Sequence, residues 1–193
     1  MLFVYIRDPR FRFCAEKVID HNKIVRQEFS KQAAYFDGRG LTLSAHEILD
    51  WIIAGLVLEV GDRVLDVAAG TGLLSRAMAP FVREVVAIDI TPEMLAIAQD
   101  ETAKRGLKNI VIDEGDAANL PYENNEFDMV ASRLAIHHFE QPAVQLSEMA
   151  RVCKPGGRVA IVDFLSPDDP DLAEICNHLE RLRDPAHTLA LSE

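Results

Sequence analysis

From residue 41 onward, short runs of apolar and β-branched residues alternate with segments of helical periodicity. The short runs predict five strands, at 63–67, 84–89, 109–113, 127–132 and 157–164. Strands that alternate with helices are typical of a parallel sheet covered by helices on both faces. The pattern therefore predicts an α/β fold with three layers and a mostly parallel sheet.

The segments between these strands carry signals for helix starts and stops. One helix is expected over about 72–80, and the next opens with Thr91 as N-cap, followed by a proline at its first position. Before the fifth strand, apolar residues recur at i, i+3, i+4 and i+7, from Leu146 to Cys153, and the helix is expected to stop at the Pro-Gly-Gly of 155–157. Cys153 is therefore predicted to lie in the core.

The first 40 residues do not follow the alternating pattern. Residues 1–40 are predicted to form a separate helical segment, with 35–40 as a flexible joint to the following helix. Residues 41–193 then form the main domain. No internal repeat is visible.

The composition agrees with a globular domain and limits its partners. Of 193 residues, 49% are hydrophobic and 26% are charged, so the chain can bury a core and does not read as disordered. The 20 Lys and Arg against 31 Asp and Glu give a formal charge of −11, and no basic run exceeds two residues. Such a chain repels phosphate backbones, so nucleic acid is not expected as a partner.

Neither an export signal nor a membrane span is predicted. The apolar start at 1–6 precedes basic residues instead of following them. The longest apolar stretch, 48–60, is interrupted by Asp50 and Glu59 and is shorter than the roughly 20 residues that a span needs. The three cysteines are widely spaced and include no Cys-x-x-Cys pair for zinc, so a reduced, cytoplasmic protein without a metal site is expected.

Residues that could bind a ligand lie at or just after the ends of three predicted strands. The first strand contains Asp66 and runs into a turn with Gly70 and Gly72, whose backbone amides can approach a ligand at a helix N-terminus. Taken alone, the turn needs glycine on steric grounds just as well. Asp89 ends the second strand, where a carboxylate can accept both hydroxyls of a ribose. Asp116 follows the third strand, where it can accept from an adenine amino group or simply be a solvated turn residue.

A nicotinamide dinucleotide site is weakly indicated. That motif needs Gly-x-Gly-x-x-Gly directly after the strand, whereas here the glycine pair starts two residues late. Ala68 stands where its first glycine would be expected, and Ser75 where its third would be. A mononucleoside cofactor fits better.

Six segments in this order resemble the class I S-adenosylmethionine-dependent methyltransferases. The similarity is to their ubiquinone/menaquinone-biosynthesis C-methyltransferase group, also called methyltransferase type 11. The segments are FSKQAAYFD at 29–37, VLDVAAGTG at 64–72, AIDITPEML at 87–95, GDAANLPYENNEFDMV at 115–130, SRLAIHHF at 132–139 and RVCKPGGRVAIVDF at 151–164. The resemblance implies a Rossmann-like sandwich that uses S-adenosylmethionine, with S-adenosylhomocysteine as product.

The same resemblance implies roles for individual residues. Asp66 and the glycine turn would hold the methionine part, Asp89 the ribose, and Asp116 the adenine, with Met94 packing on its ring. The N-terminal segment would fold over the cofactor. The cofactor-binding residues that it implies are Gln32, Tyr35, Asp66, Ala68, Gly70, Thr71, Gly72, Asp89, Ile90, Met94, Asp116, Ala117, Arg133 and His138.

The chain departs from the family in two places. Ala68 replaces the first glycine of the usual turn. Relatives continue past a stretch like 179–193 into another helix and an antiparallel hairpin that completes the sheet, whereas here the chain stops at Glu193. Either the sequence is a truncated product, or the sheet lacks the hairpin and ends at an unprotected fifth strand, which favours association.

The acceptor side contains two adjacent histidines beyond the fourth strand. His137 and His138 are candidate general bases, with His138 as the tentative catalytic residue. Because they are adjacent, we expect them to point to different sides, so at most one faces the site. The alternative is that both are structural. The segment 177–185 is either on the substrate side or an exposed amphipathic helix with Leu179 and Leu182 facing inward.

Three functions remain open. The leading one is methyl transfer from S-adenosylmethionine to a C, O or N atom of a small-molecule acceptor. A nicotinamide-dependent oxidoreductase is a second possibility, and a cofactor-binding module without catalysis is a third. The motifs name no acceptor and no oligomeric state.

Overall fold

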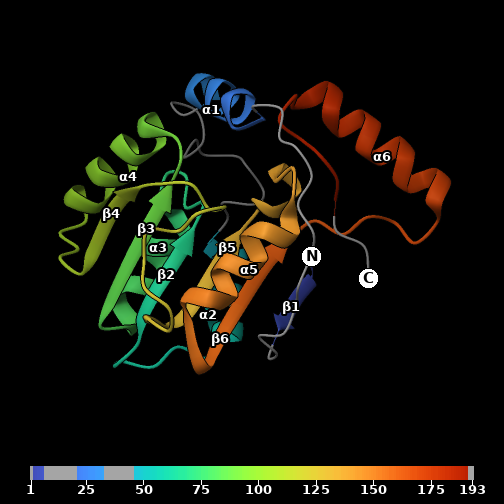
Figure 1. Cartoon of the computed structure of the whole chain (residues 1–193). Helices are drawn as coiled ribbons and strands as arrows, with labels where there is room; N and C mark the ends of the chain where they lie inside the picture. The colour runs from blue at the N-terminus through green and yellow to red at the C-terminus, as the bar shows by residue number, and fades with distance from the viewer. Residues whose placement is uncertain (1, 7–20, 33–45, 191–193) are drawn as a thin grey trace.

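The computed structural model describes residues 2–6, 21–32 and 46–190 (Figure 1). In chain order the elements are β1 (Leu2–Ile6), α1 (His21–Gln32), α2 (His46–Leu56), β2 (Arg63–Val67), α3 (Leu73–Met78), the 3-10 turn η3 (Ala79–Phe81), β3 (Glu84–Asp89), α4 (Pro92–Lys104), β4 (Ile110–Glu114), β5 (Phe127–Arg133), the 3-10 turn η4 (Ile136–His138), α5 (Pro142–Val152), β6 (Cys153–Asp163) and α6 (Pro170–Arg183).

Six strands form one sheet in the order β1-β6-β5-β2-β3-β4. Strands β2 to β6 are parallel to one another, and β1 runs antiparallel to β6. β2 lies between β3 and β5. The chain therefore adds β3 and β4 on one side of β2, and later β5 and β6 on the other side. In open α/β sheets this reversal point, at the carboxyl ends of the strands, is where ligands bind.

The core has two layers, one on each face of the sheet, because neighbouring residues of a strand point to opposite faces. One layer packs the apolar sides of α2 and α3, including Ile52 and Met78, against the sheet. The other packs α5, including Met149 and Val152, against the opposite face. The predicted α/β sandwich with helices on both faces is confirmed.

All five predicted strands are present, with shifted ends at three of them. β4 lies one residue later than expected, β5 ends one residue later, and β6 spans Cys153–Asp163 instead of 157–164. Cys153 is buried, as predicted, but as the first residue of a strand and not as part of the helix. The pairing of β6 with β5 is irregular here, because Phe127 pairs with Cys153 and Met129 with Arg158. The Pro-Gly-Gly tract lies within this irregularity, where a Cβ added at Gly157 would lie 2.7 Å from the Cys153 Sγ.

Two expectations about the sheet edge and the N-terminal segment are wrong. Leu2–Ile6 forms strand β1 where a helix was predicted, although His21–Gln32 is helical as expected. β1 pairs with β6 from Leu2 opposite Asp163 to Ile6 opposite Val159, so the fifth predicted strand is not an open edge. Leu-Phe-Val-Tyr-Ile has high strand propensity, and its partner lies too far along the chain for local pattern to reveal the pairing. The proposed joint at 35–40 lies outside the described residues.

The described helices include none long and apolar enough to cross a bilayer. Among the same residues, no cluster of histidine, cysteine or carboxylate side chains has the arrangement of a metal site.

Candidate functional site

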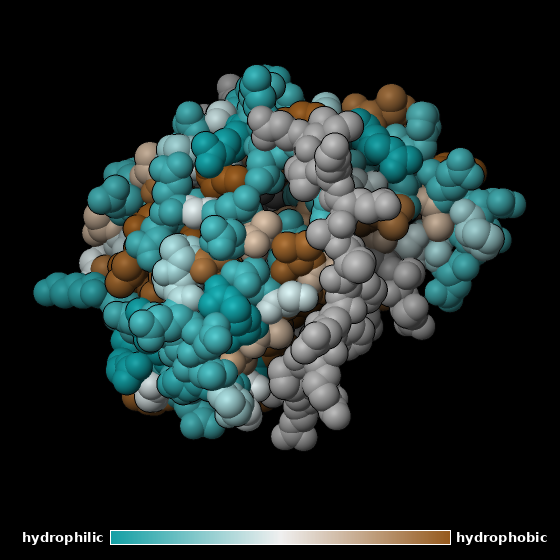
Figure 2. Space-filling view, in the orientation of Figure 1, coloured by the Kyte–Doolittle hydropathy of each residue, from teal (hydrophilic) through white to brown (hydrophobic). Residues whose placement is uncertain are grey.

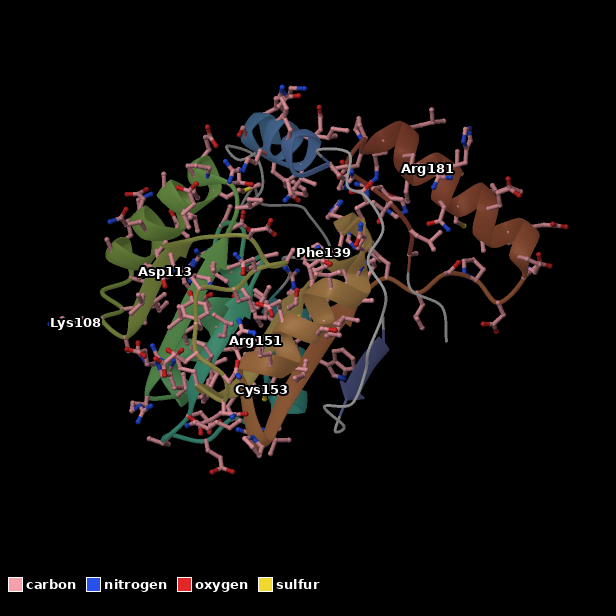
Figure 3. The ribbon with its side chains drawn as sticks, in the orientation of Figure 1. Lys108, Asp113, Phe139, Arg151, Cys153 and Arg181 are labelled. Atoms are coloured by element: carbon pink, nitrogen blue, oxygen red, sulfur yellow. The ribbon has the colours of Figure 1, made fainter. Side chains whose placement is uncertain are left out.

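A cavity of about 650 Å³ lies at the carboxyl ends of the central strands. It has two ends, which we name by their residues. The glycine-turn end contains Asp66, the turn 68–72, Asp89 and Asp116, and the histidine end contains η4 with the residues packed against it. Figure 3 shows Phe139 near the carboxyl ends of the strands, whereas Arg151 and Cys153 lie toward the opposite ends.

The turn after β2 is held in left-handed backbone conformations. Ala68, Gly70 and Gly72 have φ of 56°, 55° and 76°. A Cβ on Gly70 would meet nothing within 4 Å, whereas one on Gly72 would lie 3.1 Å from the Ala98 Cβ. Glycine is therefore favoured at position 70 by φ alone, and at position 72 by φ and by the packing of the turn against α4.

Asp89 ties this turn to the start of α4. Its Oδ2 accepts from the Gly70 amide and its Oδ1 from the Thr91 amide, both at 2.8 Å. Burial raises the pKa of Asp89, and these amide hydrogen bonds oppose the shift. Each carboxylate oxygen still has a lone pair, so Asp89 can accept two hydroxyls from a ligand in the cavity.

Asp66 is fully buried at the floor of the cavity. Its Oδ2 accepts from the Ser75 hydroxyl at 2.5 Å, while its Oδ1 has no hydrogen-bond partner among the described residues. Burial raises the pKa of Asp66 to about 7, against the attraction of the nearby Arg133. An unsatisfied buried carboxylate oxygen is costly, so this site fits a ligand with a cationic or hydrogen-bond-donating group.

Asp116 is held from two directions. Its Oδ1 accepts from the Ala118 amide and its Oδ2 from the Asn22 side chain of α1, both at 2.8 Å. The preceding Gly115 packs closely, because an added Cβ would lie 2.6 Å from the Ile88 Cδ1 and the Ile88 side chain would have to shift. Asp116 is thus an ordered residue of the cavity wall and not a freely solvated turn residue.

At the histidine end, both histidines line the cavity, and the expectation that at most one would do so is wrong. The rings of His137 and His138 have centroids 4.0 Å apart. The reason is that they lie in the 3-10 turn η4 and not in an extended strand. Successive residues of such a turn are about 120° apart, so two neighbours can face one space.

His137 is paired with a carboxylate that the sequence prediction missed. Its Nδ1 lies 2.5 Å from the Oδ1 of Asp163, the last residue of β6. Asp163 also accepts from the amides of Ile136 and Phe164, both at 2.7 Å. Burial alone would raise the pKa of Asp163, but the hydrogen bonds from His137 and the amides outweigh it and lower the pKa. An available signal was that Asp163, like Asp89, is an acid ending a buried parallel strand.

His138 has a different environment. Burial, reinforced by the charge of His137, lowers the pKa of His138 to about 4, so the ring is neutral near pH 7. Its edge packs on Phe29 of α1, with centroids 4.9 Å apart. Its Nδ1 is buried without a hydrogen-bond partner among the described residues.

Two segments distant in the chain close the histidine end. The His21 ring of α1 is 2.8 Å from the carbonyl oxygen of His138. After α6, the Thr188 amide donates to the His137 carbonyl at 2.8 Å, and its hydroxyl is 2.8 Å from the same oxygen. Asp184 lines the cavity, so the segment after α6 reaches the site.

Most of the residues predicted for the site line this one cavity. Those lining it are Asp66, Ala68, Gly70, Thr71, Asp89, Ile90, Met94, Asp116, Ala117, Arg133 and His138. Gly72 shapes the turn beneath it. The side chain of Gln32 and all of Tyr35 lie outside the described part of the chain.

A glycine turn at the reversal point of a parallel sheet, followed by an acid at the end of the next strand, is the arrangement typical of nucleotide-binding α/β domains. The family model described as "Methyltransferase domain" matches residues 65–161, which is half of the chain. The chain therefore belongs to the methyltransferase-domain family.

Similar proteins agree with this membership. The chain is 42% identical over 125 residues to "Uncharacterized methyltransferase YcgJ" of Bacillus subtilis, covering 65% of this chain and 49% of that one. It is 38% identical over 119 residues to the ubiquinone/menaquinone biosynthesis C-methyltransferase UbiE of Ectopseudomonas mendocina, covering 60% and 46%. The crystal structure of YcgJ superposes with a TM-score of 0.73 at 38% identity, covering 77% of this chain and 63% of that one. The chain spans about half the length of these two curated relatives.

Proposed function

We propose that this protein binds S-adenosylmethionine in the cavity and transfers its methyl group to a small-molecule acceptor. The observation that carries the proposal is the convergence of Asp66, Asp89 and Asp116, from three successive parallel strands, on one cavity beside a left-handed glycine turn. Membership of the methyltransferase-domain family supports it.

The residues of the glycine-turn end fit this cofactor. Asp89 has lone pairs for the two ribose hydroxyls, and the unsatisfied Oδ1 of Asp66 suits the neighbourhood of a charged amino group. Asp116 and Ala117 would face the adenine, with Met94 against its ring. Bound S-adenosylmethionine supplies a methyl group already activated by a sulfonium, so the protein has mainly to orient the two reactants and exclude water.

At the histidine end, His137 and Asp163 are suited to remove a proton from the acceptor. Donation from the His137 Nδ1–H to Asp163 fixes the tautomer, so the Nε2 lone pair is available to take the proton. The Asp163 carboxylate then stabilises the imidazolium. The low pKa of His138 makes it a poor base near pH 7, and we assign it to positioning the acceptor and His137.

The lining of this end indicates an apolar acceptor. Phe29, Leu134, Phe139 and Phe164 all line the cavity. With a base close by, the acceptor group is best a hydroxyl, an amine or an acidic carbon on an aromatic or otherwise apolar molecule. The relatives named for quinone biosynthesis support this class. The acidic charge argues against nucleic acid, and the free thiols of Cys153 and Cys176 support a cytoplasmic location.

Methyl transfer can be tested with S-adenosylmethionine labelled on its methyl group. The chain is incubated with hydroxylated aromatic molecules, beginning with reduced 1,4-naphthoquinone, and the label is followed into the organic phase. We expect transfer that is lost in the His137→Gln variant, while S-adenosylhomocysteine still binds. Binding of NADH in place of S-adenosylhomocysteine would support the oxidoreductase alternative. Cofactor binding without transfer to any acceptor would support the non-catalytic one.

A further inference from the structure

Helix α6 carries an apolar stripe that faces solvent. Leu172, Ile175, Leu179 and Leu182 have between 53% and 71% of their surface exposed. Figure 1 shows α6 at the upper right, apart from the sheet, and Figure 2 shows brown apolar atoms over it. The sequence alternative with Leu179 and Leu182 facing inward is wrong. Contiguous exposed apolar surface of this kind marks an interaction site.

The opposite side of α6 is bonded to the segment that follows the helix. Asn177 is the one buried residue described for this helix. Its Oδ1 is 2.8 Å from the His187 Nε2 and accepts from the Ala190 amide at 2.9 Å. At about 100° per residue, Asn177 points away from the middle of the apolar stripe by roughly 180°. These hydrogen bonds therefore hold the helix with its stripe outward.

We infer that this stripe is a self-association surface, on which α6 of a second copy packs antiparallel. The four positions are spaced by three, four and three residues, which is the spacing of a two-heptad helix seam. In an antiparallel pair, Leu172 lies level with Leu182 of the second copy, and Ile175 with its Leu179. Every stripe residue then faces another apolar residue.

The charges of α6 favour the antiparallel arrangement. The first turn carries Asp171, preceded by the N-cap Asp169, and the last turn carries Arg181 and Arg183, of which Arg183 also pairs with Glu180 of the same helix. Antiparallel packing brings the acidic turn of each copy level with the basic turn of the other. A parallel pair would instead align like charges and the two helix dipoles, which is unfavourable.

The acidic chain makes an anionic membrane surface a poorer fit. With a formal charge of −11 and an acidic first turn on α6, the stripe is unsuited to an anionic membrane surface. A single helix pair buries less area than a standard interface, so the dimer should be weak, with dissociation in the micromolar range.

Cys176 provides a probe of the geometry. It is exposed, and it lies one residue from the centre of the stripe. In the antiparallel pair, the two copies of Cys176 are offset by about 3 Å along the helices, whose axes are about 8–10 Å apart. A short thiol-to-thiol crosslinker can span that gap. Cys153 does not compete, because burial raises the pKa of its thiol to about 11.

Sedimentation equilibrium tests the association. The mass of the intact chain should rise from 21.5 kDa toward twice that value between about 1 and 200 μM. Ile175→Glu should raise the dissociation constant at least about tenfold, because it places a charge in the apolar seam. Val60→Glu is the matched control, since Val60 is 84% exposed but lies outside α6, and it should leave association unchanged. Both substituted side chains are exposed, so an unaltered melting temperature verifies folding.

Crosslinking in a Cys14→Ser background tests the arrangement. A short bismaleimide should join two chains through Cys176, and Ile175→Glu should abolish the product. A chain that stays monomeric to 200 μM would overturn the proposal, and so would a dimer that Ile175→Glu leaves intact. A dimer that forms no Cys176 crosslink would contradict the antiparallel geometry. None of these outcomes depends on methyl transfer.

Discussion

At the glycine-turn end of the cavity, the contacts of Asp66 and Asp89 join residues close in the chain, although Asp116 also accepts from Asn22 of α1. At the histidine end, the contacts join distant segments. Asp66 is bonded to Ser75, 9 positions away, and Asp89 to Thr91 and Gly70, 2 and 19 positions away. His137 is bonded to Asp163 and Thr188, 26 and 51 positions away, and the His138 carbonyl to His21, 117 positions away.

The difference indicates which part of the site can vary independently. A local strand–turn–strand unit fixes Asp66, Asp89 and the glycine turn, so their geometry depends on a few φ angles and two carboxylates, whereas Asp116 also depends on α1. The histidine end depends on the docking of α1 and of the segment after α6. Loops and terminal segments of this kind usually carry specificity.

The largest effect is expected for a variant that disrupts the histidine end and leaves the glycine-turn end intact. Asp163→Asn removes the carboxylate that fixes the His137 tautomer and stabilises its protonated form. Methyl transfer should fall about 10²- to 10⁴-fold. The affinity for S-adenosylhomocysteine, measured by calorimetry, should change less than about threefold, because Asp163 lies at the other end. An equal loss of cofactor affinity would mean that the two ends are not separable.

The second prediction compares the stability costs of substituting the two glycines of the turn. Gly72→Val combines φ of 76° with a 3.1 Å approach to Ala98 and should lower the free energy of unfolding by roughly 2–4 kcal/mol. Gly70→Ala has φ of 55° but open space, so it should cost only about 1 kcal/mol. Denaturant titration measures both. Equal costs would show that packing against α4 is not important there.

The third prediction concerns a substitution that disrupts the glycine-turn end. Asp89→Ala removes the proposed ribose contacts and should weaken S-adenosylhomocysteine binding roughly ten- to hundredfold. It also removes acceptors from the Gly70 and Thr91 amides, so the free energy of unfolding should fall by about 1 kcal/mol. Calorimetry and denaturant titration separate the two effects. Unchanged affinity in a folded variant would remove Asp89 from the site.

The fourth prediction concerns pH. Because burial raises the pKa of Asp66 to about 7 in the folded state, this group binds more protons in the folded chain than in the unfolded chain between about pH 4 and pH 7. The contribution of Asp66 to stability without ligand should therefore fall as pH rises through this range. Asp66→Asn, which cannot ionise, should lack this component, as thermal melts at several pH values would reveal. If the two proteins showed identical pH profiles, Asp66 would not titrate in this range.

The smallest expected effect is a stabilisation. Ala68 has φ of 56°, a conformation that glycine adopts without strain. Ala68→Gly should raise the melting temperature slightly, by less than about 1 kcal/mol in free energy, because the relief of strain exceeds the added flexibility of the unfolded chain. A clear destabilisation would show that the alanine methyl packs usefully in the turn.

The sequence predicted the glycine-turn end more fully than the rest. Gly70, Asp89 and Asp116 could be identified because strand, turn and acid follow one another in the chain. The pairing of His137 with Asp163 was missed, since a hydrogen bond between two strand ends leaves no local pattern. The shared orientation of the two histidines also depends on η4, which a residue-by-residue alternation does not anticipate.

Two further features depend on tertiary packing. β1 was predicted as helix because its pairing with β6 joins positions 2–6 to 159–163. The sequence does not determine whether the apolar stripe of α6 points inward or outward. An amphipathic pattern defines an apolar face of a helix but not the direction in which that face points. Asn177 decides that direction through hydrogen bonds to residues beyond the helix.

Calorimetric titration of the intact chain with S-adenosylhomocysteine, with NADH as the control ligand, tests the central claim most directly. The account predicts saturable binding of S-adenosylhomocysteine at one site per chain, weakened by Asp89→Ala, and no heat of binding with NADH. Binding of NADH alone, or no binding of S-adenosylhomocysteine to a folded chain, would contradict it.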